Sequence, residues 1–178
     1  MNITDLCKKL SDFSDVVELM SAATMQEISD FEKRNNISLP GSYKELISFF
    51  DGGEIFIPGT IIYGINEHKG YKTIREINGS EYRKRFNIPK THLIFGKLNY
   101  GDLLCINLND PYDVILWSSD TDEEDFSWDS LSKWLEETIN DYEEYDEIYY
   151  NRIGCSVRIG GMYPLRRYEP ESVRDLRN

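Results

Sequence analysis

The chain of 178 residues carries 20 basic and 32 acidic side chains, and its net charge of −12 at pH 7 disfavours nucleic acids and anionic membranes as partners, because both bind clustered lysine and arginine. The hydrophobic share of 40% and the aromatic share of 13% are typical of a folded globular protein. Three cysteines without C-x-x-C spacing indicate neither a disulfide framework nor a zinc site, and we expect no cofactor. No export signal or membrane-spanning run is evident in the sequence, so we expect a cytoplasmic protein.

The N-terminal part is predicted to be helical. After Thr4, apolar residues recur at intervals of three and four, which predicts one helix with an apolar face. These residues are Leu6, Leu10, Phe13, Val17 and Met20. A capping box at Thr24-x-x-Glu27 predicts a second helix that stops near Asn35 and Asn36.

The pattern then changes from helix to strand. Ser42-x-x-Glu45 repeats the capping box and predicts a short third helix, which ends at Asp51-Gly52-Gly53. Beyond these glycines, β-branched runs predict strands at Glu54–Ile57 and Ile61–Tyr63.

Residues 69–86 predict a partly basic helix that is interrupted at Gly79. Three strands joined by short turns are predicted next. They are His92–Phe95, Leu103–Leu108 and Val114–Trp117. A last helix is expected around Leu131, with Ser127 or Asp129 as its cap.

This order of helices, strands and helix predicts an α+β fold, with a largely antiparallel or mixed sheet flanked by N-terminal helices and a C-terminal helix. We expect one domain over residues 1–150. Residues 151–178 are rich in arginine and form an extension, either a late strand with a docked tail or a flexible end.

The sequence lacks a recognisable catalytic pattern. His68 and His92 are the only histidines, and no nucleophile signature surrounds any cysteine. The acidic loop Asp120–Asp125 resembles a calcium loop but lacks the glycine and the glutamate that such a loop needs at positions six and twelve. We therefore expect no metal and no enzymatic activity, although so acidic a chain leaves paired carboxylates open as an alternative.

The distribution of charge is more informative. Between Asp110 and Glu147, fifteen acidic residues stand against Lys133 alone, with aromatic residues among them. Such a run is either tolerated solvation or a surface for a cationic protein, in which charge speeds the encounter and rings slow release. For Trp128, packing of the last helix onto the sheet is the favoured interpretation. The residues expected to contact a partner are Asp120, Asp122, Glu123, Glu124, Asp125, Asp141, Tyr142, Glu143, Glu144 and Tyr145.

Ordered motifs in the chain resemble the Smi/Knr-like branch of the SUKH superfamily over residues 27–139. In the first half, the resemblance rests on Phe31-Glu32, Leu39-Pro40, Tyr43, Asp51-Gly52-Gly53 and Tyr63-Gly64. In the second half it rests on Leu93–Gly96, Gly101-Asp102, the strand Val114–Trp117 and a closing helix at Phe126–Leu135. Asp51 departs from the family, which often has asparagine there, and Glu32 and Asp102 are expected to serve structure.

The resemblance implies an α+β immunity protein that binds a cognate bacterial toxin and blocks it. The acidic chain favours a basic toxin, with a nuclease as one candidate. The alternative is a regulator or adaptor of the same fold, as in the family's eukaryotic relatives that act on cell wall and signalling. An enzyme of another type is the third hypothesis, and it requires a pocket with two or more strongly shifted ionisable groups.

Overall fold

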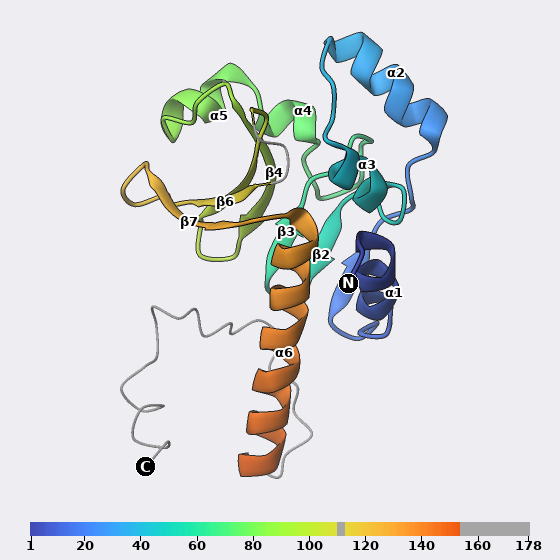
Figure 1. The fold of residues 1–178 in the computed structure, drawn as a ribbon, viewed down its shortest axis with the longest axis vertical. Coiled ribbons are helices and arrows are strands. Elements are labelled where there is room, and N and C mark those ends of the chain that lie inside the picture. The colour runs from blue at the N-terminus through green and yellow to red at the C-terminus, as the bar shows by residue number, and fades with distance from the viewer. Residues whose placement is uncertain (110–112, 154–178) are drawn as a thin grey trace.

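The computed structural model describes residues 1–109 and 113–153, and of residues 145–153 it describes only the helical backbone (Figure 1). Helix α6 continues through residue 150, where the sequence places the end of the domain. From residue 154 onward, the expected C-terminal extension lies outside the described residues.

The strands of the described chain form one antiparallel sheet of seven, and each strand pairs with its neighbour in the sequence. They are β1 (Val17–Leu19), β2 (Gly53–Ile55), β3 (Thr60–Ile62), β4 (His92–Leu98), β5 (Leu103–Asn107), β6 (Val114–Trp117) and β7 (Glu124–Trp128). This meander leaves β1 and β7 as its two edges. The expected α+β class and antiparallel pairing are confirmed.

The helices are α1 (Ile3–Ser11), α2 (Met25–Asn35), α3 (Gly41–Ile47), α4 (Ile74–Ile77), α5 (Ser80–Arg85) and α6 (Leu131–Ile153). In Figure 1, α4 and α5 lie over the β4–β6 end of the sheet, whereas α1 and α3 lie at the β1–β2 end. The long orange helix α6 starts beside β7, and its lower half extends past the other described elements. Within residues 1–109 and 113–153, no helix is long and apolar enough to cross a membrane.

The first predicted helix is too long. Helix α1 ends at Ser11, and Val17–Leu19 forms the edge strand β1, in which Val17 lies opposite Ile55 of β2. The spacing of apolar residues continues past the helix because Phe13 also turns inward, where its ring contacts Phe56 at a centroid distance of 5.4 Å. Pairing with β2 therefore overrides the helical periodicity.

Helices α2 and α3 begin differently. The capping box of α2 is present, with Thr24 and Glu27 bonding reciprocally, and Asn36 closes the helix in the left-handed conformation at φ 50°. The capping box expected at Ser42 is wrong: α3 begins at Gly41 behind Pro40, without a side-chain cap. Ser42 already lies in the first turn, where its side chain cannot act as the cap.

The interruption between α4 and α5 fastens both helices to the sheet. The side chain of Asn78 donates to the carbonyls of Ile74 and Ile94 at 2.8 Å and accepts the Ile94 amide at 2.9 Å. Arg83 of α5 bonds the same Asn78 side chain and the carbonyl of His92, each at 2.7 Å. The predicted break is confirmed, and it is a point of attachment to β4.

The sequence interpretation missed strand β7. Residues 124–128 pair with β6, where a loop and the start of the closing helix were expected. Helix α6 begins at Leu131, and its capping bond comes from Ser130, whose hydroxyl accepts the Lys133 amide at 3.0 Å, so Ser127 and Asp129 were the wrong caps. The inner face of α6 then enters the core, where the Trp134 ring meets Phe95 edge to face at 5.4 Å.

Candidate protein-binding surface

The glycine-rich motif after α3, Asp51-Gly52-Gly53, is buried and bonds to the turn after β3. The fully buried carboxylate of Asp51 accepts the amide of Ile65 at 2.7 Å and that of Asn66 at 2.9 Å, and Nε2 of His68 lies 3.5 Å away. Gly64 passes so close that a Cβ there would lie 2.1 Å from the Asp51 carbonyl oxygen. Asp51 thus holds the turn after β3 and does not face solvent.

Glu32 and Asp102 also serve structure, as expected. Glu32 Oε1 accepts the Leu39 amide at 2.7 Å and pairs with Lys44 at 3.3 Å, which fixes the link between α2 and α3. Asp102 Oδ1 accepts both the amide and the hydroxyl of Ser119, at 2.8 and 3.0 Å.

Both cysteines that the structure describes are buried. Burial raises the pKa of the Cys7 and Cys105 thiols to about 12, so neither supplies a thiolate at neutral pH. Burial lowers the pKa of His92, whose ring meets Trp117 edge to face at 5.8 Å. Among the residues described, no three His, Cys, Asp or Glu side chains are grouped as a metal ion would require.

The expected acidic loop forms one end of the molecule. Its first part is a turn, in which Asp122 adopts φ 55° and the Ser118 amide donates to the Glu123 carbonyl at 2.9 Å. Its second part belongs to strand β7, which begins at Glu124. We call this group of carboxylates the acidic end. It consists of Asp120, Asp122, Glu123, Glu124 and Asp125. The side chains of Asp120, Glu123 and Glu124 are exposed, and those of Asp122 and Asp125 are partly exposed.

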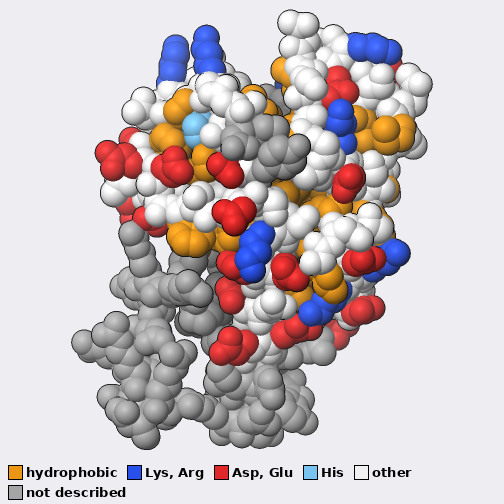
Figure 2. Space-filling model, in the orientation of Figure 1, with side chains coloured by type: hydrophobic (Ala, Val, Ile, Leu, Met, Phe, Trp, Pro, Cys, Tyr) orange, Lys and Arg blue, Asp and Glu red, His pale blue; other side chains and the backbone are white. Residues whose placement is uncertain are grey.

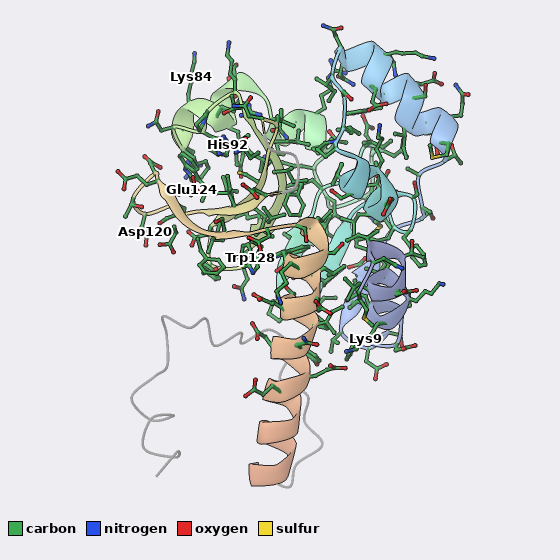
Figure 3. All side chains as sticks on the ribbon, viewed as in Figure 1. Lys9, Lys84, His92, Asp120, Glu124 and Trp128 are labelled. Atoms are coloured by element: carbon green, nitrogen blue, oxygen red, sulfur yellow. The ribbon has the colours of Figure 1, made fainter. Side chains whose placement is uncertain are left out.

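The figures show how these carboxylates gather. In Figure 2, acidic side chains cluster on the left flank, over the region where Figure 1 draws β6, β7 and the turn between them. Figure 3 places Asp120 and Glu124 together there, with Lys84 of α5 above them. The structure therefore brings the first half of the predicted contact set onto one surface.

The second half, on α6, does not join this surface. Asp141, Glu143 and Glu144 are exposed, and Glu143 pairs with Lys9 at 2.7 Å. In Figure 3, Lys9 lies on the α1 side of the molecule, far from Asp120. The side chain of Tyr145 lies outside the described residues.

Tyr142 is a core residue and not an exposed anchor. Its ring is 9% exposed, stacks on Phe56 at a centroid distance of 4.1 Å and meets Phe13 edge to face at 5.6 Å. The sequence held the signal for this position, because Leu135, Ile139 and Tyr142 follow one another at four and three residues, the spacing of one helix face. Tyr142 therefore does not belong to the surface that was expected to contact a partner.

An aromatic pair on β7, which the sequence interpretation did not assign to a surface, accompanies the acidic end. The side chain of Phe126 is 47% exposed and meets Trp128 edge to face at 4.8 Å. Trp128 is half-buried, and its indole N–H donates to Glu137 of α6 at 2.9 Å. The packing role expected for Trp128 is thus confirmed, while Phe126 offers an apolar ring to solvent beside the carboxylates.

Comparison with known proteins identifies a family and a fold. The model of the SMI1 / KNR4 family (SUKH-1) matches residues 22–137. A crystal structure of a protein from Pseudomonas syringae pv. tomato aligns with a TM-score of 0.57 and 14% identity, covering 75% of this chain and 95% of that one, which shows a shared fold. No curated protein matches the chain.

Proposed function

The chain belongs to the SMI1 / KNR4 family (SUKH-1), and from this premise we propose that it is a bacterial immunity protein, which binds a cognate toxin in the cytoplasm and neutralises it without chemistry of its own. The observation that supports this function most directly is the acidic end, whose strand β7 also carries the exposed ring of Phe126. Because aromatic residues anchor interfaces and opposite charges steer partners together, this surface suits a basic protein.

Two properties of the surface favour a protein partner over a small molecule. The carboxylates lie on a turn and an edge strand, where they are exposed or partly exposed, and they are spread over residues 120–125. Small ligands are usually held in concave sites that enclose most of their surface, whereas an exposed ring and exposed charges on one edge strand are typical of the core and rim of a protein interface. A basic toxin such as a nuclease fits this chemistry.

Co-expression tests the proposed function. Cells that express the toxin encoded beside this chain are expected to survive when the chain is present and to die when it is absent. Unprotected cells would reject the immunity function. Capture of several non-toxin partners from the native cell, together with no protection, would instead favour a regulator, a role that other members of the family have.

Reversing the charge of the acidic end is expected to weaken toxin binding. Replacing Asp120, Glu123 and Glu124 by lysine turns attraction into repulsion at three exposed positions, which we expect to raise the Kd on the order of 100-fold. The free energy of unfolding should change by less than about 0.5 kcal/mol, because exposed side chains contribute little to stability. Calorimetry with a catalytically inactive toxin gives the first quantity, and urea titration gives the second.

A matched variant separates local from global charge. Glu45, Glu67 and Asp12 are also exposed and lie on α3, on the loop after β3 and at the end of α1. Their triple replacement by lysine changes the net charge by the same amount but leaves the acidic end intact. If both triple variants bind equally weakly, the interface lies elsewhere.

Salt is expected to act on association more than on dissociation. Raising ionic strength from about 0.01 to about 0.15 M shortens the Debye length from roughly 30 to 8 Å, which screens attraction between the separated proteins. The association rate constant should therefore fall steeply while the dissociation rate constant stays nearly constant. Stopped-flow or surface-binding kinetics measure both rate constants. An association rate constant that does not change with salt would show that electrostatic steering plays no part in binding.

A further inference from the structure

Strand β7 forms an open edge of the described sheet. It pairs with β6 on one side, and within residues 1–109 and 113–153 no strand pairs with its other side. The opposite edge, β1, is only three residues long, and the carboxylate of its central Glu18 accepts the Tyr71 hydroxyl at 2.8 Å. The five-residue β7 is the longer edge, and an edge strand offers backbone groups with which another strand can pair.

The register gives the two faces of β7 different chemistry. Residues opposite each other on paired strands point to the same side of the sheet, so Phe126 shares a side with Leu116, and Trp128 shares it with Val114. A bulge shifts the register at Asp125 and places Glu124 opposite Trp117, on the other side. The aromatic pair therefore lies on one face of the edge and Glu124 on the other.

Charge decides what can be added to this edge. Two copies of β7 side by side would bring two acidic ends to one edge, and their like charges would repel each other. A strand with lysine or arginine on the face of Glu124 would be attracted instead. Its alternate side chains would meet Phe126 and Trp128, where apolar groups pack best.

We propose that β7 binds an extended segment of the partner by strand addition, and that in this segment basic residues alternate with apolar ones. The alternation follows from the two faces of β7, because the bulge at Asp125 places Glu124 on one face and the aromatic pair Phe126 and Trp128 on the other. The identity of the partner as a basic toxin rests on the proposed function, whereas the mode of binding rests on the edge itself.

A synthetic peptide tests the mode without the toxin. The probe is a seven-residue peptide of alternating arginine and valine, with both termini blocked, titrated into the full chain by calorimetry. Its control has the same composition in two blocks, four arginines followed by three valines. We expect the alternating peptide to bind at least about tenfold more tightly than the block peptide, a difference of one decade in Kd.

Three further measurements identify the edge. The alternating peptide with methylated backbone nitrogens keeps its charge but cannot donate to a strand, so we expect its binding to disappear. In the full chain, Phe126→Ala should weaken the alternating peptide about tenfold. Ile37→Ala removes another exposed apolar side chain, 40% exposed and outside β7, and should change nothing. Amide exchange of residues 124–128 should slow when the peptide is bound.

The outcomes separate the mode from the function. Equal affinity for the alternating, block and methylated peptides would show simple charge attraction and overturn strand addition, even if the chain neutralises its toxin. Selective binding of the alternating peptide with no protection against the toxin would retain strand addition and overturn the immunity function. Unchanged binding to the Phe126 variant would also overturn the assignment to β7.

Discussion

Replacing Gly64 by alanine is expected to destabilise the folded domain by about 3 kcal/mol or more, the upper range for overpacking a buried site. The added Cβ would lie 2.1 Å from the carbonyl oxygen of Asp51 and 2.6 Å from its Oδ1. The first of these atoms is backbone, which cannot rotate away. Relief would have to separate the two segments, which breaks the bonds from Ile65 and Asn66 to the Asp51 carboxylate.

Urea unfolding of the variant measures this effect, with Gly41→Ala as the matched control. Gly41 opens helix α3, and nothing lies within 4 Å of the Cβ that alanine would add there. Alanine should be neutral or stabilise the protein by up to about 1 kcal/mol, because it lowers the conformational entropy of the unfolded chain. Equal stability of the two variants would contradict the close approach of Gly64 to Asp51.

Replacing Asp51 by alanine is expected to cost on the order of 3 kcal/mol, since each hydrogen bond to a charged acceptor contributes about 1.5 to 3 kcal/mol. The carboxylate is fully buried and accepts two backbone amides, of which that of Ile65 is buried as well. Alanine leaves both amides without this acceptor and removes the side chain that faces His68. The turn after β3 should therefore loosen.

The asparagine variant refines the test of Asp51. Asparagine keeps one acceptor oxygen but turns an NH₂ group toward the second backbone N–H. The Asp51→Asn variant should therefore be less stable than the parent protein and more stable than the Asp51→Ala variant. Thermal and urea unfolding of the three proteins give the order, with Asp120→Ala as an exposed control that should change stability by less than about 0.5 kcal/mol. An asparagine variant as stable as the parent would show that one acceptor suffices.

Local signals in the sequence predicted the fold where structure is decided locally. The capping box at Thr24 and the helix it starts need only residues close in the chain, and both are confirmed. Strand β1 was missed because Val17 continues a helical spacing and becomes a strand only through pairing with Ile55, which is distant in sequence. Strand β7 was missed because only Phe126 and Trp128 mark it, among polar neighbours.

The candidate surface was predictable in its charge and not in its shape. Six acidic residues and no basic ones lie between Asp120 and Asp129, so an electronegative end follows from composition. The exposure of Phe126 depends on β7 being an edge of the described sheet, and the burial of Tyr142 depends on α6 lying against Phe13 and Phe56. Both depend on contacts between elements that are distant in the sequence.

The order of the sheet has a consequence for how the chain acquires its fold. Each strand pairs with the strand that precedes it in the sequence, so during synthesis every new strand finds its partner already made, although the β1–β2 and β3–β4 pairs form across intervening helices. The contact that closes the molecule comes last, when α6 reaches back to α1 and Glu143 meets Lys9 across 134 positions of sequence. Until α6 has left the ribosome, the part of the apolar face of α1 that α6 covers stays exposed, and exposed apolar surface favours aggregation of the nascent chain.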